Sequence, residues 1–334
     1  MPPLALTMGD PAGIGGEIAV AAWRALRGAG PAFFAIDDPD RLAALGAPVA
    51  AIADPAEAAG CFAKALPVLP ERLAAPARPG RPDPANAPAT VRSVARAAAL
   101  AQARAAAAVV TNPIAKKAVQ EGAGFAFPGH TEYLAHLTGA PRAVMLLASP
   151  TLKVVPVTIH LALAEAVRAL DGALIRDTLR VLHAALRADF GVAQPRIAVA
   201  GLNPHAGEGG TMGREEIEII APALEALRAE GMAIAGPLPA DTLFHAAARA
   251  RYDAAACMYH DQALIPAKAL DFERAVNVTL GLPIVRTSPD HGVAYDIAGT
   301  GRASPASLIE ALRMARSMAD RRARAAAAPA DAPG

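Results

Sequence analysis

The chain has 334 residues, enough for two domains of ordinary size, and 54% of them are hydrophobic. Its 32 Lys and Arg residues nearly balance its 31 Asp and Glu residues, and no basic stripe with interleaved aromatic residues occurs, which argues against a nucleic-acid-binding surface. It has only two cysteines, no signal-peptide pattern and no run of about 18 apolar residues, so we expect a soluble cytoplasmic protein without disulfides or membrane spans.

Apolar runs alternate with helical patterns along the whole chain. Strands are predicted at residues 4–7, 32–36, 108–110, 143–148, 152–159, 197–200, 254–259 and 276–280. Helical patterns end at Leu26 and cover about 90–107, 161–190, 215–230 and 305–324. Seven prolines from Pro67 to Pro88 predict a long ordered loop, because proline lacks the N–H that helices and central strands need. The alternation predicts an α/β protein with a largely parallel sheet.

Three of the strand-like runs end in a histidine. His160, His205 and His260 follow the runs at 154–159, 197–200 and 254–259. Ligands of open α/β sheets bind at the carboxyl ends of the strands, so these imidazoles are candidates for a divalent-metal site. Any one of these histidines alone is more often a hydrogen-bonded structural residue than a metal ligand, so the prediction depends on the repeated context.

Two other segments have the pattern of anion or cofactor sites. A glycine-rich turn from Met8 to Gly16 joins a strand to a helix, and its backbone N–H groups either bind an anion or only form a tight connection. His130 and Thr131 precede a helical pattern whose N-terminus favours a phosphate or carboxylate, although Thr131 as a plain N-cap is the simpler interpretation. Lys268 and Arg286 are candidates for the same kind of ligand.

These residues alone leave three classes of protein open. One is a metal-assisted dehydrogenase of an anionic hydroxy acid, and another is a metal-dependent hydrolase or a phosphoryl- or acyl-transfer enzyme. The third is a non-catalytic phosphate-binding module.

Seven motifs in order make the chain resemble one enzyme family. They are MGDPAGIG from Met8, TNPIAKK from Thr111, GHTE from Gly129, LNPHAGEGG from Leu202, GPLPADTLF from Gly236, MYHDQ from Met258 and NVTLGLP from Asn277. Together they resemble the 4-hydroxythreonine-4-phosphate dehydrogenases of pyridoxal phosphate biosynthesis, from about Leu4 to Arg316. Gly16 stands where many members have proline, and Thr211 where some have histidine.

The resemblance implies two α/β/α domains with a fold like isocitrate and isopropylmalate dehydrogenases. It implies a homodimer with the active site in the interdomain cleft at the dimer interface. We expect a cofactor-side domain of residues 1–128 together with 281–324, and a metal, substrate and dimerisation domain of residues 129–280. The tail 325–334 is expected to fray.

The family also implies roles for individual residues. His160, His205 and His260 match the metal ligands, one of them supplied by the partner subunit. The positions that match the substrate-binding residues are His130, Thr131, Lys268, Asn277 and Arg286. The segment from His291 to Gly299 looks like the adenosine-binding loop of isopropylmalate dehydrogenases. The expected cofactor-binding residues are therefore Gly9, Asp10, Gly13, Gly292 and Asp296.

The expected reaction is oxidation of 4-phosphooxy-L-threonine at C3 by NAD or NADP, followed by decarboxylation. It needs one divalent metal ion per active site, with zinc, magnesium, cobalt and manganese all open. The general base is undecided between Asp241, Asp261 and Lys268. A paralogous dehydrogenase of 4-phosphothreonate or of a cyclic dihydrodiol remains the main alternative.

Overall fold

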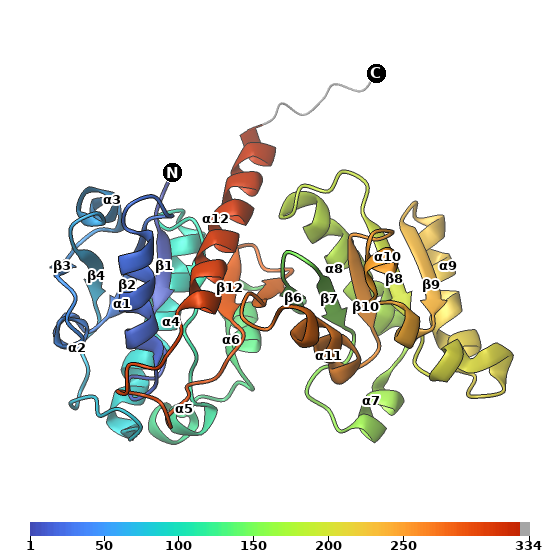
Figure 1. Cartoon of the computed structure of the whole chain (residues 1–334), viewed down its shortest axis with the longest axis horizontal. Coiled ribbons are helices and arrows are strands. Elements are labelled where there is room, and N and C mark those ends of the chain that lie inside the picture. The colour runs from blue at the N-terminus through green and yellow to red at the C-terminus, as the bar shows by residue number, and fades with distance from the viewer. Residues whose placement is uncertain (328–334) are drawn as a thin grey trace. The chain divides into compact units, whose positions relative to one another are not determined.

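The computed structural model describes residues 1–327 as a mixed α/β chain with two compact units (Figure 1). The first unit contains Met1–Ala143 and Val276–Asp320, and the second contains Val144–Ala275 with the residues from Arg321 onward. Each unit has its own strands and covering helices, so the predicted α/β class is confirmed.

The strands of the first unit run in the order β3-β4-β2-β1-β5-β12-β11. Their bounds are β1 (Leu4–Thr7), β2 (Phe33–Asp37), β3 (Val49–Ala51), β4 (Leu66–Pro70), β5 (Val109–Val110), β11 (Val276–Leu280) and β12 (Arg286–Pro289). All pairs in this series are parallel except β11 with β12. The carboxyl ends of β1, β2, β4 and β5 therefore face one edge, where ligands of such sheets bind.

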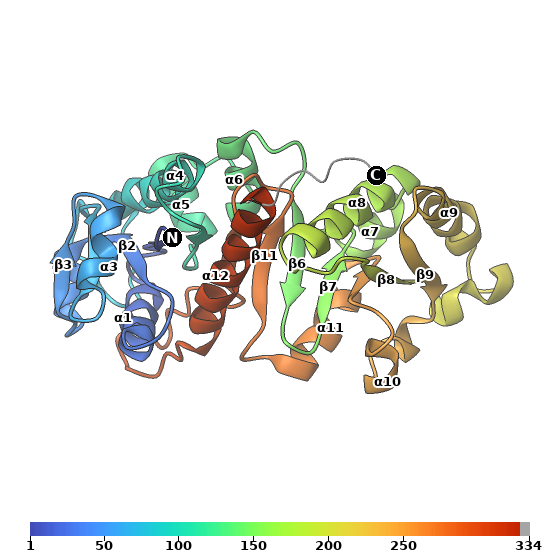
Figure 2. The same ribbon diagram turned by 90° about the horizontal axis from the view of Figure 1, so that it is seen from above.

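Helices cover both faces of this first sheet, with α1 and α12 on one side and α4 and α6 on the other (Figure 2). The helices are α1 (Gly15–Leu26), α2 (Pro39–Ala44), α3 (Ala58–Cys61), α4 (Ala87–Gln102), α5 (Lys116–Ala123), α6 (His130–Thr138) and α12 (Ala306–Ala327), with 3₁₀ turns at Pro55–Glu57 and Pro84–Asn86. Val94, Ala97 and Ala98 of α4 share a buried core with Phe34 and Ile36 of β2. The small alanine side chains let α4 lie close to the sheet.

The strands of the second unit run in the order β6-β7-β10-β8-β9. Their bounds are β6 (Val144–Ala148), β7 (Lys153–Pro156), β8 (Arg196–Ala200), β9 (Ala233–Leu238) and β10 (Ala254–Cys257). The helical elements are α7 (Leu163–Ala169), α8 (Gly172–Ala188), η3 (Pro204–Gly210), the π-turn η4 (Glu216–Ile220), α9 (Ala221–Ala229), η5 (Ala240–Thr242), α10 (Ala246–Arg249) and α11 (His260–Asp271). The predicted helical segment 161–190 is thus two helices, because Asp171 caps α8 by accepting a hydrogen bond from the Leu174 N–H.

The expectation of a loop throughout the proline-rich segment is wrong at its start, where β4 lies between β2 and β3. Leu66 donates its N–H toward β3. Because successive residues of a strand face opposite neighbours, the nitrogen of Pro67 faces β2. The pairing of β4 with β2 begins only at the next residue, Val68. Pro70 follows the last hydrogen bond to β3, which Ile52 donates to the Val68 carbonyl. Both prolines therefore occupy positions at which neither neighbouring strand needs an N–H donor.

The observed units differ from the expected domain boundaries in three short segments. Residues 321–324 belong to the second unit, where Arg322 pairs with Asp189. Residues 129–143 belong to the first unit because α6 shares its core with α4, and 276–280 belong there because β11 pairs with β12. Of the expected tail 325–334, the described part continues α12 through Ala327, and the rest lies outside the described residues.

Candidate active site

The three predicted metal ligands follow three neighbouring strands of the second unit. β10 pairs in parallel with both β7 and β8, so the carboxyl ends of these strands face the same edge. β7 and β10 end two or three residues earlier than expected, whereas β8 ends at Ala200 as expected, and His160, His205 and His260 follow the three strands by four, five and three residues. The loops beyond the strands therefore position the imidazoles.

Two of the three imidazoles lie together. The ring centroids of His160 and His260 are 5.8 Å apart, whereas His205 is exposed in η3. Over residues 1–327, no three His, Cys, Asp or Glu side chains are grouped so that they could hold a metal ion. One chain therefore presents an imidazole pair rather than a complete three-histidine centre.

The ring of His260 is oriented by its neighbour in the sequence. Oδ1 of Asp261 lies 2.7 Å from Nδ1 of His260, which favours a proton on Nδ1 and a lone pair on Nε2. Histidines that bind metals usually have such a carboxylate at the far nitrogen. The donor set of neutral imidazoles thus fits a divalent metal such as zinc or cobalt.

Gln262 connects the segments that carry His260 and His205. Its Oε1 accepts a hydrogen bond from the Met258 N–H, and its Nε2 donates to the Gly201 carbonyl, both at 2.7 Å. Sequence reasoning included Gln262 in a motif but gave it no role. Its amide needs one acceptor and one donor on different strands, which only the fold brings together.

Arg286 is a buried cation at the first residue of β12. Only 4% of its surface is exposed. Its Nε and Nη2 donate to Thr111 Oγ1 at 3.2 and 2.6 Å, and its Nη1 donates to Thr279 Oγ1 at 2.9 Å. A longer contact of 3.5 Å joins Nη1 to Oδ1 of Asn277.

All these acceptors are neutral oxygens, and no carboxylate of the described chain forms an ion pair with Arg286. Burial lowers the pKa of Arg286 to about 10, and the negative charge of Glu132 opposes that shift. A buried guanidinium with only neutral acceptors favours an anion, since phosphate or carboxylate would supply the missing charge. Thr111 and Thr279 were not expected to contribute. The only sequence signal for Thr279 is its spacing of two from Asn277, which places both on one side of β11.

His130 and the start of α6 add neutral donors and acceptors near this guanidinium. Nε2 of His130 is buried without a hydrogen-bond partner. Burial, followed by the positive charges of Arg286 and Lys116, lowers the pKa of His130 to about 3, so the imidazole is neutral at physiological pH.

The expectation that Thr131 caps α6 is wrong. Gly129 is the N-cap and no side chain caps the helix, so the first backbone N–H groups of α6 remain available to an anion.

The remaining substrate and general-base candidates lie in the second unit. Lys268 is half-buried on α11, with its Nζ 5.9 Å from the ring centroid of Phe272. Asp241 is exposed in η5, and Asp261 is exposed beside His260. Asp261 is within hydrogen-bonding distance of a metal-ligand candidate, His260.

The predicted cofactor segments pack against each other within the first unit. A Cβ at Gly13 would lie 2.8 Å from the Val293 carbonyl, and Ile14 donates its N–H to that same oxygen. Oδ2 of Asp10 accepts a hydrogen bond from the Tyr295 hydroxyl at 2.7 Å, and burial together with that bond raises the pKa of Tyr295.

Local packing therefore accounts for the residues of the glycine-rich turn. A Cβ at Gly9 would lie 2.7 Å from Cβ of Asn112, and Gly9 also has a φ of +69°. Gly292 has no atom within 4 Å of its Cβ position and Asp296 is exposed, so these two predicted residues face open space.

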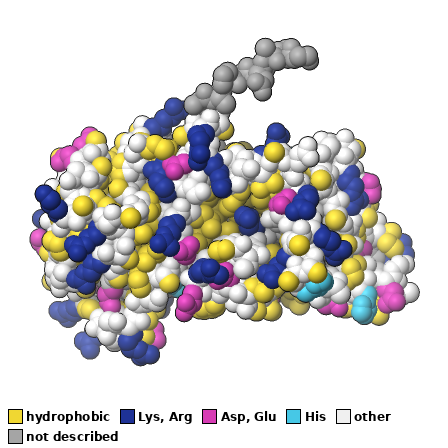
Figure 3. All heavy atoms as spheres, turned by 45° about the horizontal axis from the view of Figure 1, so that its top comes forward, with side chains coloured by type: hydrophobic (Ala, Val, Ile, Leu, Met, Phe, Trp, Pro, Cys, Tyr) yellow, Lys and Arg dark blue, Asp and Glu magenta, His cyan; other side chains and the backbone are white. Residues whose placement is uncertain are grey.

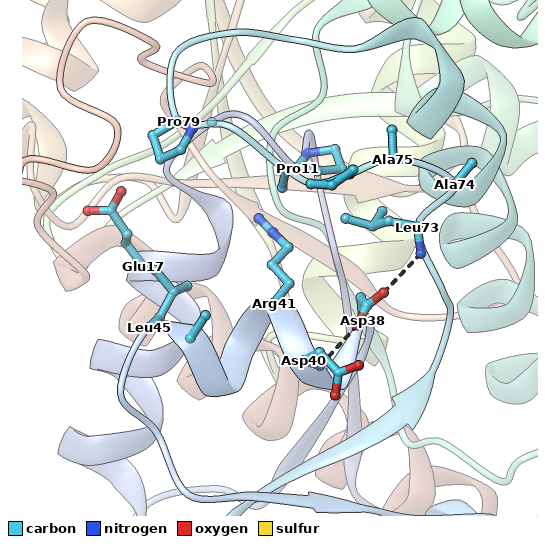
Figure 4. Close-up of a pocket in the computed structure, with 14 residues that line it drawn as sticks. Pro11, Glu17, Asp38, Asp40, Arg41, Leu45, Leu73, Ala74, Ala75 and Pro79 are labelled. Carbon is cyan, nitrogen blue, oxygen red and sulfur yellow. Dashed lines mark hydrogen bonds between the residues drawn. The ribbon is translucent and has the colours of Figure 1, made fainter.

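A cavity of about 580 Å³ lies beside the turn, at the carboxyl ends of β2 and β4 (Figure 4). Its walls include Leu73 and Pro79, and its charged groups are satisfied within the protein. Arg41 Nη1 lies 2.6 Å from Oδ2 of Asp37, and Asp38 accepts a hydrogen bond from the Leu73 N–H at 3.0 Å. The charged groups of this cavity are therefore paired with one another or with the backbone, whereas Arg286 hydrogen-bonds only to neutral oxygens.

The shifted pKa of His130 predicts an acid sensitivity. Below pH 6.5 the unfolded chain protonates this histidine while the folded chain does not, so its contribution to stability falls as pH falls from 6.5 toward 3. Between pH 7 and 5, we expect the free energy of unfolding of the wild-type protein to fall more than that of His130→Gln. The extra loss is at most about 1.4 kcal/mol for each pH unit below 6.5. Urea unfolding at several pH values measures this difference, and identical pH profiles would contradict it.

Comparison with known proteins supports a single family over most of the chain. The family model described as "Pyridoxal phosphate biosynthetic protein PdxA" matches residues 35–315. A 4-hydroxythreonine-4-phosphate dehydrogenase of Roseobacter denitrificans is 57% identical over 320 residues, covering 96% of this chain and 98% of the relative.

Solved structures give the same result. The 4-hydroxythreonine-4-phosphate dehydrogenase of Klebsiella pneumoniae is 41% identical with a TM-score of 0.86, covering 96% of this chain and 100% of its own. A terephthalate 1,2-cis-dihydrodiol dehydrogenase of Burkholderia xenovorans is more distant, at 29% identity and a TM-score of 0.65, covering 95% of this chain and 98% of its own.

Two surface properties agree with the composition. Lys and Arg side chains are scattered over the face in Figure 3, with Asp and Glu between them. None of the helices within residues 1–327 has the length and apolar character needed to cross a membrane.

Proposed function

The chain belongs to the PdxA family of pyridoxal phosphate biosynthetic proteins, and from this membership we propose that it oxidises 4-phosphooxy-L-threonine at C3. The immediate product is a β-keto acid, and its loss of carbon dioxide gives 3-amino-2-oxopropyl phosphate. The proposed setting is the cytoplasm.

The observation that carries this proposal is the buried charge of Arg286, whose hydrogen-bond acceptors within the described chain are all neutral. The phosphate or carboxylate of the substrate supplies the anion that the neutral hydroxyls of Thr111 and Thr279 cannot. His130 offers its unpartnered Nε2, and the uncapped start of α6 at Thr131 offers backbone N–H groups. Asn277 lies at the edge of this group. Lys268, in the second unit, is proposed as a further substrate-binding residue from the family motif alone. Together they fix C3 for hydride transfer.

We propose a divalent metal held by three imidazoles and shared across a homodimer. His160 and His260 lie together in one chain, so His205 is the ligand expected from the other subunit. The metal supplies Lewis acidity, which lowers the pKa of the substrate hydroxyl and stabilises the developing ketone. Asp261 orients His260. Because its Oδ1 already pairs with Nδ1 of His260, we do not propose Asp261 as the general base.

A nicotinamide cofactor, NAD or NADP, would supply the hydride acceptor when bound. Gly292 and Asp296 are proposed to contact it, since they face open space. Gly9, Asp10 and Gly13 support that loop through the packing described above. An exposed carboxylate at Asp296 favours NAD, because it would accept hydrogen bonds from a ribose and repel a 2′-phosphate.

The group that removes the hydroxyl proton is proposed to be Asp241, with Lys268 as the alternative. Asp241 is exposed, so it can act directly or through water. Full activity of Asp241→Asn with metal bound would exclude it.

Steady-state rates with two substrates test the proposed function. We expect kcat/KM for 4-phosphooxy-L-threonine to exceed that for 4-phosphothreonate by at least about tenfold, since one lost polar contact changes the barrier by about 1.4 kcal/mol or more. NADH or NADPH formation, followed by absorbance, reports both reactions. The reverse preference would support the paralogous function, and activity only on a cis-dihydrodiol would support the function named for the Burkholderia relative.

A further inference from the structure

The turn that carries His205 has a left-handed backbone over five successive residues. The φ values from His205 to Gly209 are 53, 52, 78, 41 and 66°. His205, Ala206 and Glu208 are not glycine, and each such residue costs roughly 1–2 kcal/mol in this conformation. A turn of this kind persists only where surrounding contacts impose it.

Glu216 is the buried group inside this turn. It is 3% exposed, and its Oε1 accepts a hydrogen bond from the Asn203 N–H at 2.7 Å while Oε2 accepts one from Asn203 Nδ2 at 3.0 Å. Its carboxylate lies close to two glycines, Gly201 just before the turn and Gly207 within it. A Cβ would lie 3.0 Å from Oε1 at Gly201 and 2.6 Å from Oε2 at Gly207.

The helical geometry around Glu216 is also unusual. Glu216 is the first residue of the π-turn η4, a rare form that widens one turn of helix and occurs frequently at functional sites. Within the described chain no basic side chain forms an ion pair with Glu216. The carboxylate is therefore directed to the turn and not to a neighbouring cation.

We propose that Glu216 is a positioning residue that holds His205 in the left-handed turn and so presents its imidazole to the metal. The proposal rests on the metal site of the proposed function. A carboxylate is required because both of its oxygens accept hydrogen bonds from Asn203. Glutamine has nearly the same size but would direct an amide N–H at a donor of Asn203.

The test compares Glu216→Gln with Glu218→Gln, an exposed glutamate on the same segment whose Oε1 pairs with Arg214. Titration of each metal-free protein with Zn²⁺ or Co²⁺ by calorimetry measures the affinity. We expect Glu216→Gln to weaken metal binding about 10- to 100-fold, as loss of a group that orients a ligand usually does. With saturating metal its kcat should stay within a few-fold of the wild-type value, and Glu218→Gln should resemble the wild type in both measurements.

Gly207→Ala provides a second route if Glu216→Gln fails to fold. Its methyl group presses on Oε2 of Glu216, so it should weaken metal binding in the same direction. Unchanged affinity in a folded Glu216→Gln or Gly207→Ala protein would overturn the proposal. A wild-type protein that binds no divalent metal would instead refute the metal site of the proposed function.

Discussion

Replacing Arg286 with methionine is expected to lower kcat/KM for 4-phosphooxy-L-threonine by roughly 100- to 1000-fold, the usual loss when a buried charged contact is removed. The reason is that Arg286 offers the buried positive charge of the first unit to the substrate's anionic groups. The same substitution should leave stability unchanged or raise it. The guanidinium is buried against neutral oxygens only, so an apolar side chain of similar length avoids a desolvation cost.

Two measurements on each protein test this combination. Steady-state kinetics gives kcat/KM, and thermal unfolding without substrate gives the stability. Arg313→Met is the matched control, because the Arg313 side chain is 59% exposed and pairs with Glu310 on the same helix. We expect its kinetics to stay within about twofold of the wild type, as for most exposed positions. Lower stability of Arg286→Met with unchanged kcat/KM would show that the arginine is structural.

His160→Ala and His205→Ala are each expected to reduce metal-dependent turnover by at least about a thousandfold, because the site loses one of three ligands. A mixture of the two inactive variants should regain activity if the ligands come from different subunits. In a mixed dimer, one site would carry both defects and the other would be intact. Random exchange makes about half of the dimers mixed, so we expect about a quarter of wild-type activity.

His160→Ala mixed with His260→Ala is the control for this experiment. These two histidines lie together in one chain, so every site of that mixture lacks one ligand and activity should not return. The subunits are exchanged by dilution and concentration, and bound metal is measured beside the rate. Recovery in both mixtures, or in neither, would contradict the proposed sharing of the site.

Eight of the twelve described strands were predicted because they depend on local pattern, whereas β3, β4, β9 and β12 were not. The runs before His160, His205 and His260 are strands, and their parallel pairing places three loops on one edge as predicted. The strand at Pro67 and Pro70 was missed because proline tolerance depends on which neighbour needs an N–H, and only the sheet determines that.

The site was less accessible to sequence reasoning where it depends on contacts between distant residues. Thr111 and Arg286 are 175 residues apart and share one hydrogen-bonding group, and nothing in either segment indicated that the two side chains would meet. Glu216 reads as one charge in an acidic helical pattern, yet its carboxylate is buried against two glycines. The motifs identified which segments matter, while burial and pairing identified what each side chain contacts.

The order of the segments along the chain has a consequence for synthesis on the ribosome. The first unit is discontinuous, and its strand β5 pairs with β1 on one side and with β12 on the other. β12 emerges only after residues 144–275 have been made, so β5 waits with an unpaired edge that can join another chain. The strands of the second unit form one uninterrupted stretch. The half of the protein that is begun first is therefore completed last, and nascent chains released before Arg286 would lack both the closing strand and its buried charge.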